Sequence, residues 1–520
     1  MSDKPARRVS YVHSDELQRV GDALPSNVGR ASLVHSLISS HGLLDDGEGE
    51  DEGNATRGYN RATIVVPARA TREELLSFHD DELIDSLLGA MTSSESDSDS
   101  ESSQETNLPR KRRKLSHEPP HMGTSLVDDC PPFSLLPNYV PLVAGASLTA
   151  ARQLRDGLAD VAISWNGGRH HASRGEAKGF CYVNDIVLAI MELRKKPVPR
   201  SPSPPPSPSQ GASDEEKTSS PRRLPRPSPP KKLSKILYLD LDLHHGDAVE
   251  SAFLSSPYIL TLSLHLHAPL FYPSTGSLDS SGPTNSKAAG KGHALNLALE
   301  SGLSGDALRR VWETVENVKE SFAPDAVVVQ CGIDGLNGDP CKEWNLSLSD
   351  FGSCISSALE WNLPTLLLGG GGYSSPNAAR TWTYLTSVCL DRPLSPTSQI
   401  PSSLSSEEYE QFGPSFTLDV EANETVRDKN NDLTLAKVEG VFERYCESLR
   451  KRWKTQSPRT KKTGILEVTS TGETTRDGQD VTSESEQPFE RIKKEKKKVR
   501  FELVDSPGLT NQSSDTDENQ

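Results

Sequence analysis

The chain has 520 residues, of which 34% are hydrophobic and 25% are charged, and it contains 37 prolines and 37 glycines. This composition predicts one large folded core with disordered additions, and a formal net charge of −16 excludes a protein that binds nucleic acid through its overall charge. Neither an N-terminal apolar segment of a signal peptide nor a run of about 18 apolar residues occurs, and the seven cysteines include no CxxC pair, so we expect a soluble intracellular protein.

Apolar, strand-like runs recur along the chain and alternate with segments of helical spacing. The runs are TIVV from Thr63, DVAISW from Asp160, KILYLDLDL from Lys235, YILTLSL from Tyr258, DAVVVQC from Asp325 and PTLLL from Pro364. Helical spacing follows the second run, at Val183, Ile186, Val187, Ile190 and Met191. The alternation predicts an α/β fold, a single large domain with a mostly parallel central sheet that is flanked by helices on both faces.

Three stretches are predicted to be disordered, because they contain too few apolar side chains to offset the entropy lost on ordering. They are an acidic serine run with a basic cluster at residues 92–121, a segment rich in proline and serine at 195–232, and a charged tail at 456–520. The second stretch separates a helix that ends near Arg194 from a strand that begins near Lys235. It is therefore an insertion in a loop rather than a domain boundary.

Polar loops follow four of the strand-like runs. WNGGRHHA follows DVAISW, HHGD follows LYLDLDL, GIDG follows AVVVQC, and GGGGY follows PTLLL. Ligands of open α/β sheets bind beyond the carboxyl ends of the strands, so we expect the four loops to meet at one edge of the sheet.

One of these runs carries the residues of a metal site. Asp240, Asp242 and His244 stand at alternate positions, which share one face of a strand, and Asp334 arrives from another strand. Carboxylate and imidazole ligands with one open position are typical of catalytic zinc, whereas a structural site is closed by four ligands, mostly Cys or His.

Each motif taken alone also has an explanation without catalysis. A DxDxHH run can be a salt-bridged strand end, the paired histidines can be hydrogen-bonded loop residues, GGGGY can be a flexible turn, and the aspartate of GIDG can cap a helix. All four explanations would have to hold at one edge of the sheet. The metal site is therefore the preferred interpretation.

RHHA, GFCYVND, YLDLDLHHGD, LSLH, GID and LGGGGY, in this order and spacing, resemble the class I zinc-dependent histone deacetylase family, which has the arginase/deacetylase fold. YVHSDELQRV, RASLVHSL and LLSFHDDELI resemble its N-terminal helices. The resemblance implies a catalytic domain over residues 8–455 with the two insertions inside it, and a zinc-dependent hydrolase that removes acetyl groups from lysine in histones. Chromatin regulation and transcriptional repression would follow from that activity.

The resemblance implies two ion sites. The zinc ligands would be Asp242, His244 and Asp334. A structural monovalent cation, K⁺, would be held nearby, largely by backbone carbonyls. The residues implied for the cation are Asp240, Asp242, His244, Ser263 and Leu264.

Catalytic roles are implied for five residues. His170 and His171 would be paired histidines that Asp240 and Asp247 orient, respectively. His171 would take a proton and return it to the leaving lysine amine, and Tyr373 would donate a hydrogen bond to the oxyanion.

The implied substrate site is a channel for the acyl-lysine side chain. Gly179 and Phe180 would line one wall of the channel, and Tyr272 would line the other. Asp129 at the mouth of the channel would hold the substrate backbone, and Cys341 would also lie at the mouth.

The sequence departs from the family in several places. Arg169 replaces an apolar residue beside the paired histidines, Tyr272 stands where a channel phenylalanine is usual, and Cys341 replaces an aliphatic residue. Pro340 and Pro376 stand where members bound to corepressors carry arginines that hold an inositol phosphate. This speaks against recruitment through such a complex and resembles the subgroup that works alone and is implicated in cohesin deacetylation.

Location and substrate stay open to alternatives. PRKRRK at 109–114 is typical of a nuclear localisation signal, and IKKEKKKVR at 492–500 offers a second basic segment, so we expect a nuclear protein that can also occur in the cytoplasm. The partner would be an acetylated histone tail or another acetylated nuclear protein, such as a cohesin subunit, with no membrane and no sequence-specific nucleic acid. Acetylpolyamines remain an alternative substrate, a binuclear ureohydrolase is less favoured, and a catalytically silent chromatin scaffold is the alternative from another class.

Overall fold

The computed structural model describes residues 6–45, 60–89, 129–198, 230–285 and 287–456. These residues belong to one compact unit, Met1–Ser457, and Pro458–Gln520 form a second unit. Several predictions lie outside the described residues. They concern the insertion at 92–121 with its basic cluster at 109–114, most of the insertion at 195–232, and the tail from 457 onward with its basic segment at 492–500.

The described residues form one sheet of nine strands in the order β2-β3-β1-β4-β9-β8-β5-β6-β7, and every neighbouring pair is parallel. The predicted α/β fold with a parallel sheet is confirmed. The strands are β1 Val9–Val12, β2 Leu44–Asp45, β3 Ala62–Val65, β4 Val161–Ser164, β5 Ile236–Asp240, β6 Ile259–Leu266, β7 Ala294–Leu299, β8 Ala326–Gln330 and β9 Thr365–Leu368.

Three of these strands were not predicted. The segment YVHSDELQRV was expected to be helical, but its first residues end β1 and the helix begins only at Asp15, after the N-cap residue Ser14. In β7 the polar residue Asn296 interrupts the apolar pattern, and this strand forms because it pairs with β6, where Ser263 is the partner of Asn296. The two-residue strand β2 carries no pattern of its own.

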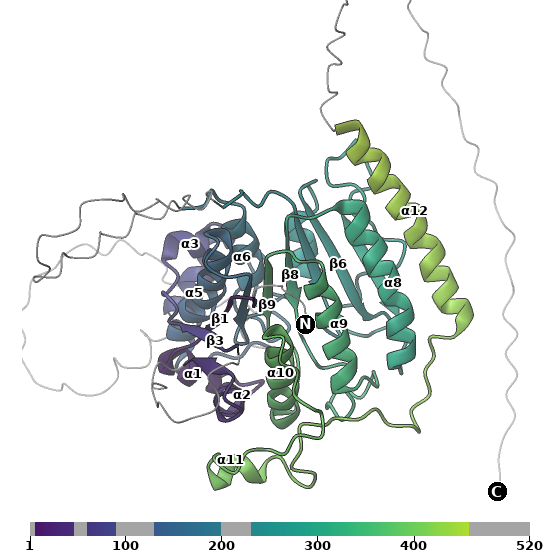
Figure 1. Cartoon of the computed structure of the whole chain (residues 1–520). Coiled ribbons are helices and arrows are strands. Elements are labelled where there is room, and N and C mark those ends of the chain that lie inside the picture. The colour runs from purple at the N-terminus through teal and green to yellow at the C-terminus, as the bar shows by residue number, and fades with distance from the viewer. Residues whose placement is uncertain (1–5, 46–59, 90–128, 199–229, 286, 457–520) are drawn as a thin grey trace, which may run out of the picture. The chain divides into compact units, whose positions relative to one another are not determined.

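Helices cover both faces of the sheet (Figure 1). In β5 the alternate residues Ile236 and Tyr238 pack with α1, α4, α5 and α6, whereas Leu237 and Leu239 pack with α2, α8, α9, α10 and α12. Within the described part of the chain, no helix has both the length and the apolar composition needed to cross a membrane. The helices are α1 Asp15–Asp22, α2 Arg30–Ser40, α3 Arg72–Leu76, α4 Asp81–Gly89, α5 Leu136–Arg155, α6 Asp185–Leu193, α7 Asp247–Phe253, α8 Gly305–Phe322, α9 Leu348–Glu360, α10 Ser375–Cys389, α11 Ser406–Glu410 and α12 Asp432–Gln456.

The four strands that precede the polar loops are neighbours in the middle of the sheet, in the order β4-β9-β8-β5. Because all four are parallel, their carboxyl ends lie at the same edge. We call the loops that follow these four strands the rim. The sheet topology therefore brings the predicted site residues together.

Candidate active site

The predicted metal ligands converge at the rim. The Nδ1 atom of His244 lies 2.9 Å from Oδ2 of Asp334 and 3.3 Å from Oδ1 of Asp242, although the three residues come from two different loops. Both carboxylates are 1% exposed. The imidazole of His244 thus contacts two buried carboxylates inside the protein.

The prediction that Asp240, Asp242 and His244 share one face of a strand is wrong, because β5 ends at Asp240. Two hydrogen bonds to carboxylates accompany the bend of the chain after this residue. The backbone N–H of Asp242 donates to Oδ1 of Asp240 at 3.1 Å, and that of Leu243 donates to Oδ1 of Asp334 at 2.8 Å. These backbone N–H groups therefore donate to carboxylates instead of to a neighbouring strand. The bend still brings the predicted ligands together.

The chemistry of the cluster fits a divalent cation. Burial, together with the negative charge of Asp242, raises the pKa of Asp334, because two carboxylates are held close together away from water. Glycines allow this close approach: a Cβ atom at Gly332 would lie 1.9 Å from Oδ2 of Asp242, and one at Gly371 would lie 2.3 Å from Oδ2 of Asp334. Two carboxylates and one imidazole form a ligand set that suits catalytic zinc.

Cys341 was expected at the mouth of the channel, but it lies close to the cluster of Asp242, His244 and Asp334. Its Sγ atom lies within 4.8 Å of metal-binding atoms of His244 and Asp334. Its backbone N–H donates to Oδ1 of Asp339 at 3.0 Å, which fixes the segment beside the ligands.

The paired histidines are both buried and each faces a carboxylate. Nδ1 of His170 lies 2.9 Å from Oδ2 of Asp240, and Nδ1 of His171 lies 3.0 Å from Oδ1 of Asp247. The structure brings together the partners that the resemblance implies. Lys178, which sequence reasoning missed, lies 2.6 Å from the second carboxyl oxygen of Asp247 through its Nζ atom.

The two imidazoles differ in their protonation. Burial and the charge of His170 lower the pKa of His171 to about 3, so His171 is neutral at pH 7 and can accept a proton. Burial also disfavours the charged form of His170, but the charges of Asp242 and Asp240 outweigh this and raise its pKa to about 9. The surroundings of the two imidazoles thus shift their pKa values in opposite directions.

Tyr373 ends the glycine-rich loop after β9 and lines the same cavity as His170, His171 and Asp242. The loop has φ angles of +150° at Gly370 and +124° at Gly372, a conformation that L side chains rarely adopt. Burial, with the nearby charge of Asp334, raises the pKa of Tyr373 well above its usual range. Its hydroxyl therefore stays protonated and can donate a hydrogen bond.

Two partly exposed aromatic residues stand at the entrance of this cavity. Phe180 is 40% exposed and Tyr272 is 38% exposed. Between them Gly179 has φ +58°, and a Cβ atom there would lie 2.5 Å from Cδ2 of His171 and 2.7 Å from the hydroxyl of Tyr272. The backbone N–H of Gly179 donates to Oδ2 of Asp129 at 2.7 Å, so Asp129 holds the channel wall.

The residues implied for a monovalent cation lie at the end of β5, in the loop that follows it and inside the neighbouring strand β6. Asp240 in β5 is the register partner of Ser263 in β6, and Leu264 follows directly. The hydroxyl of Tyr238 donates to Oδ2 of Asp240 at 2.5 Å.

Gln330 was missed by sequence reasoning. Its Nε2 donates to Oδ2 of Asp242 at 2.8 Å, and its Oε1 accepts from the backbone N–H of Gly332 at 2.7 Å. The available signal was a single amide residue at the end of the apolar run DAVVVQ. A buried amide there fixes the orientation of a metal ligand.

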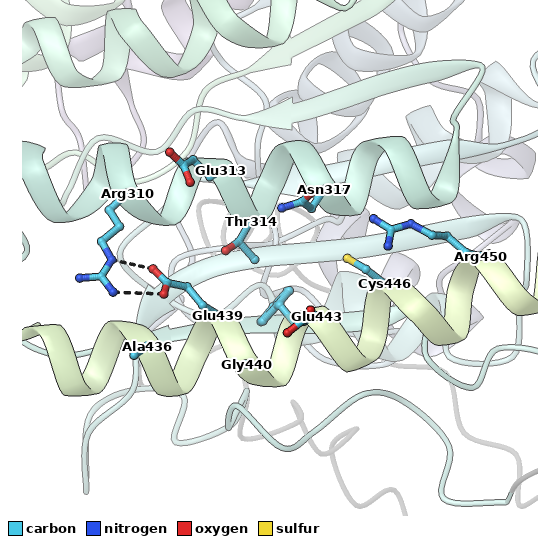
Figure 2. Close-up of a pocket in the computed structure, with 11 residues that line it drawn as sticks. Arg310, Glu313, Thr314, Asn317, Ala436, Glu439, Gly440, Glu443, Cys446 and Arg450 are labelled. Atoms are coloured by element: carbon cyan, nitrogen blue, oxygen red, sulfur yellow. Dashed lines mark hydrogen bonds and ion pairs between the residues drawn. The ribbon is translucent and has the colours of Figure 1, made fainter.

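A larger cavity lies between α8 and α12 and contains none of the predicted site residues. Figure 2 shows that Arg310 and Glu439 point toward one another across it, with Nε of Arg310 2.6 Å from Oε1 of Glu439. The size of a cavity therefore does not locate the chemistry in this protein.

The site combines a metal-binding cluster with a buried imidazole that a carboxylate orients. Such a combination is suited to activating a water molecule for the hydrolysis of an amide or ester. The fold and the rim together are typical of a hydrolase of the α/β class.

Comparison with known proteins agrees with this class. The histone deacetylase domain model matches residues 24–200 and 228–389. Histone deacetylase 8 of Xenopus tropicalis is 35% identical over 414 residues, which cover 79% of this chain and 90% of that protein. Histone deacetylase 8 of Danio rerio is 35% identical over 415 residues, covering 80% and 89%, and human histone deacetylase 1 is 32% identical over 450 residues, covering 85% and 75%. The chain belongs to the class I histone deacetylase family, and it is an enzyme of the deacetylase type.

Proposed function

We propose that the protein hydrolyses the acetyl amide of N6-acetyl-lysine in a zinc-dependent reaction and acts in this way on histones, in chromatin regulation and transcriptional repression. The observation that carries the proposal is that His171, held by Asp247, lines the same cavity as Asp242 and Tyr373. The catalytic domain would span residues 8–455.

Zinc, when bound by Asp242, His244 and Asp334, would polarise the acetyl carbonyl and lower the pKa of a bound water molecule. His171 would accept a proton from the attacking water through Nε2, since its Nδ1 atom faces Asp247. The water oxygen bonds to the carbonyl carbon while the carbonyl π electrons move onto its oxygen. When these electrons return, the carbon–nitrogen bond breaks and His171 gives its proton to the lysine amine. Lysine and acetate are the products.

The other residues stabilise charge and position the substrate. The hydroxyl of Tyr373 donates to the oxygen on which negative charge develops, and the positive charge of His170 lies beside the same centre. Phe180 and Tyr272 would flank the four methylenes of the lysine side chain, because partly exposed rings are suited to covering an apolar stem. A K⁺ ion between the end of β5 and the interior of β6 would stabilise the bend that carries the ligands.

The family and the acidic chain favour an acetylated histone tail as the substrate, because such a tail is basic. Another acetylated nuclear protein, such as a cohesin subunit, and acetylpolyamines are the alternatives. Pro340 and Pro376 support action without an inositol-phosphate-dependent corepressor complex. The basic cluster at 109–114 supports a nuclear location.

The test is to incubate the purified protein with an acetylated nuclear proteome and to measure acetyl loss site by site. We expect loss at histone tail lysines. Loss confined to cohesin or to other nuclear proteins would assign the alternative substrate. No loss from any protein or from acetylpolyamines, with zinc bound, would contradict the proposed activity and favour the scaffold.

A further inference from the structure

Arg169 lies on the loop after β4, directly before the paired histidines, and it is 5% exposed. Its Nη2 atom donates to the backbone oxygen of Asn166 at 3.2 Å, and its Nε atom is buried without a hydrogen-bond partner among the described residues. An arginine side chain cannot give up its charge in a protein. The structure therefore holds a buried positive charge with unused hydrogen-bonding capacity.

A second guanidinium lies close to it. Arg30 in α2 is 4% exposed, and its Nη1 atom donates to the backbone oxygens of Gly370 and Gly372 at 3.2 and 2.8 Å. Burial, and then the charge of Arg169, lower the pKa of Arg30 to about 9, so both side chains are charged at pH 7. Two like charges are thus held together behind the glycine-rich loop.

The nearby carboxylates are occupied by other donors. Asp185 accepts hydrogen bonds from the hydroxyl of Ser147 and from the backbone N–H groups of Gly168 and Arg169. Asp339 accepts from the backbone N–H groups of Tyr373 and Cys341. Neither forms an ion pair with Arg169 within the part of the chain that the structure describes. Burial disfavours the charged form of Arg169, but Tyr139, Cys181 and Asp185 outweigh this and raise its pKa. What the site lacks is a hydrogen-bond partner for the buried Nε atom, which a bound anion would supply.

The position of Arg169 identifies which part of a substrate would meet it. Arg169 lines the same small cavity as Gly371, Cys181 and Tyr373. Phe180, which is partly exposed, also lines this cavity. A lysine side chain that enters past Phe180 places its amide carbonyl near Tyr373. On the proposed function, the acyl group would lie in the part of the cavity that Arg169 lines.

We propose that Arg169 selects acyl groups that end in a carboxylate, with malonyl-lysine as the best fit and succinyl-lysine next. This inference rests on the proposed function, because it specifies the acyl group that the same site accepts. Malonyl comes first because the cavity is small. Water adds across the amide bond as before, the carbon–nitrogen bond breaks, the lysine amine receives the proton, and malonate leaves in place of acetate.

The test compares kcat/KM for two peptides that differ only in charge at the end of the acyl group. Malonyl-lysine and isovaleryl-lysine have the same shape, and the second is neutral. We expect the wild type to prefer malonyl-lysine. In Arg169→Met the ratio of malonyl to isovaleryl activity should fall about 10-fold to 100-fold, the usual effect of losing a charge-assisted hydrogen bond. Arg174→Met is the matched control, because Arg174 lies on the same loop with its side chain 65% exposed, and it should leave the ratio unchanged.

A binding measurement keeps the inference separate from catalysis. The Tyr373→Phe protein, titrated with the two peptides by calorimetry, should bind malonyl-lysine more tightly, and the added Arg169→Met should remove the difference. If Arg169→Met does not fold, Arg169→Lys, which keeps the charge, should retain part of the preference. A wild type that hydrolyses acetyl-lysine but prefers isovaleryl-lysine overturns the inference. If the wild type hydrolyses no acyl-lysine peptide at all, the proposed function is contradicted instead. The calorimetric comparison of the two peptides then tests the inference by itself.

Discussion

The rim and the cavity between α8 and α12 both carry charged side chains, but they bury them to different extents. At the rim, Asp242 and Asp334 are each 1% exposed, whereas the side chains of Arg310 and Glu439 are 35% and 38% exposed. Water can replace either partner of the second pair, so that pair contributes little. The carboxylates at the rim need a cation and fixed hydrogen bonds. Burial of charge, rather than the size of a cavity, therefore distinguishes these two regions.

The largest effect is expected from removing a metal ligand at the rim. Asp334→Ala removes one of two buried carboxylates and should lower both zinc content and turnover of an acetyl-lysine peptide, the latter by about 1,000-fold or more. Glu439→Ala is the control, because it removes a carboxylate from the other cavity and should change neither. Metal analysis and kinetics on the same samples check this, and full zinc with full turnover in Asp334→Ala would remove this residue from the ligand set.

Tyr373→Phe should have the next largest effect. The substitution keeps the ring and removes only the hydroxyl, so kcat should fall by about 100-fold to 1,000-fold, the usual loss for an oxyanion donor. Zinc content and peptide binding should change far less. Equal turnover of wild type and variant would show that the hydroxyl has no catalytic role.

A smaller effect concerns the stability of the rim at low pH. Nε2 of His79 accepts a hydrogen bond from the backbone N–H of Asn184 at 3.0 Å, and the side chain of Asn184 donates to the backbone oxygen of Ala172, next to the paired histidines. Burial lowers the pKa of His79 to about 4. The unfolded chain takes up a proton near pH 6.5 and the folded chain does not, so stability is complete above about pH 6.5 and falls as the pH drops toward 4.

Over that range His79 should account for a loss of about 3 kcal/mol in the free energy of unfolding. Urea unfolding at several pH values checks this. His79→Gln should be less stable than the wild type at pH 7.5, and the difference should shrink toward pH 4. A constant difference at all pH values would show that His79 is not held neutral.

The smallest effect is expected from the ion pairs between α8 and α12. Arg310→Ala removes two surface ion pairs, with Glu439 and with Asp432, whose partners all contact water. The urea midpoint and the turnover should therefore stay close to those of the wild type. A loss as large as that of a rim variant would show that burial does not separate the two regions.

The sequence predicted the parallel sheet and the location of the site because both depend on local patterns. Apolar runs that end in DLDLHHGD, GID or GGGGY reveal a buried strand and the loop after it. β1 and β7 were missed because short strands gain their stability from neighbours that are distant in sequence, such as β4 and β6.

Parts of the site were hidden for the same reason. The bend after Asp240 depends on hydrogen bonds to Asp334, which is distant in sequence, so alternation along β5 could not reveal it. Gln330 and Lys178 act by contacting other site residues and belong to no pattern of their own. Residues of this kind are found only when the tertiary contacts are known.

The most direct test of the account is to measure hydrolysis while the metal content is varied. Protein stripped with a chelator should release no lysine from an acetyl-lysine peptide, and the rate should rise in proportion to added zinc until about one equivalent is bound. Mg²⁺ in the same titration should restore no activity, because a site of two carboxylates and one imidazole with few waters suits zinc better. Full activity in zinc-free protein, or inactivity with one zinc bound, would contradict the central claim that the rim is a zinc-dependent deacetylase site.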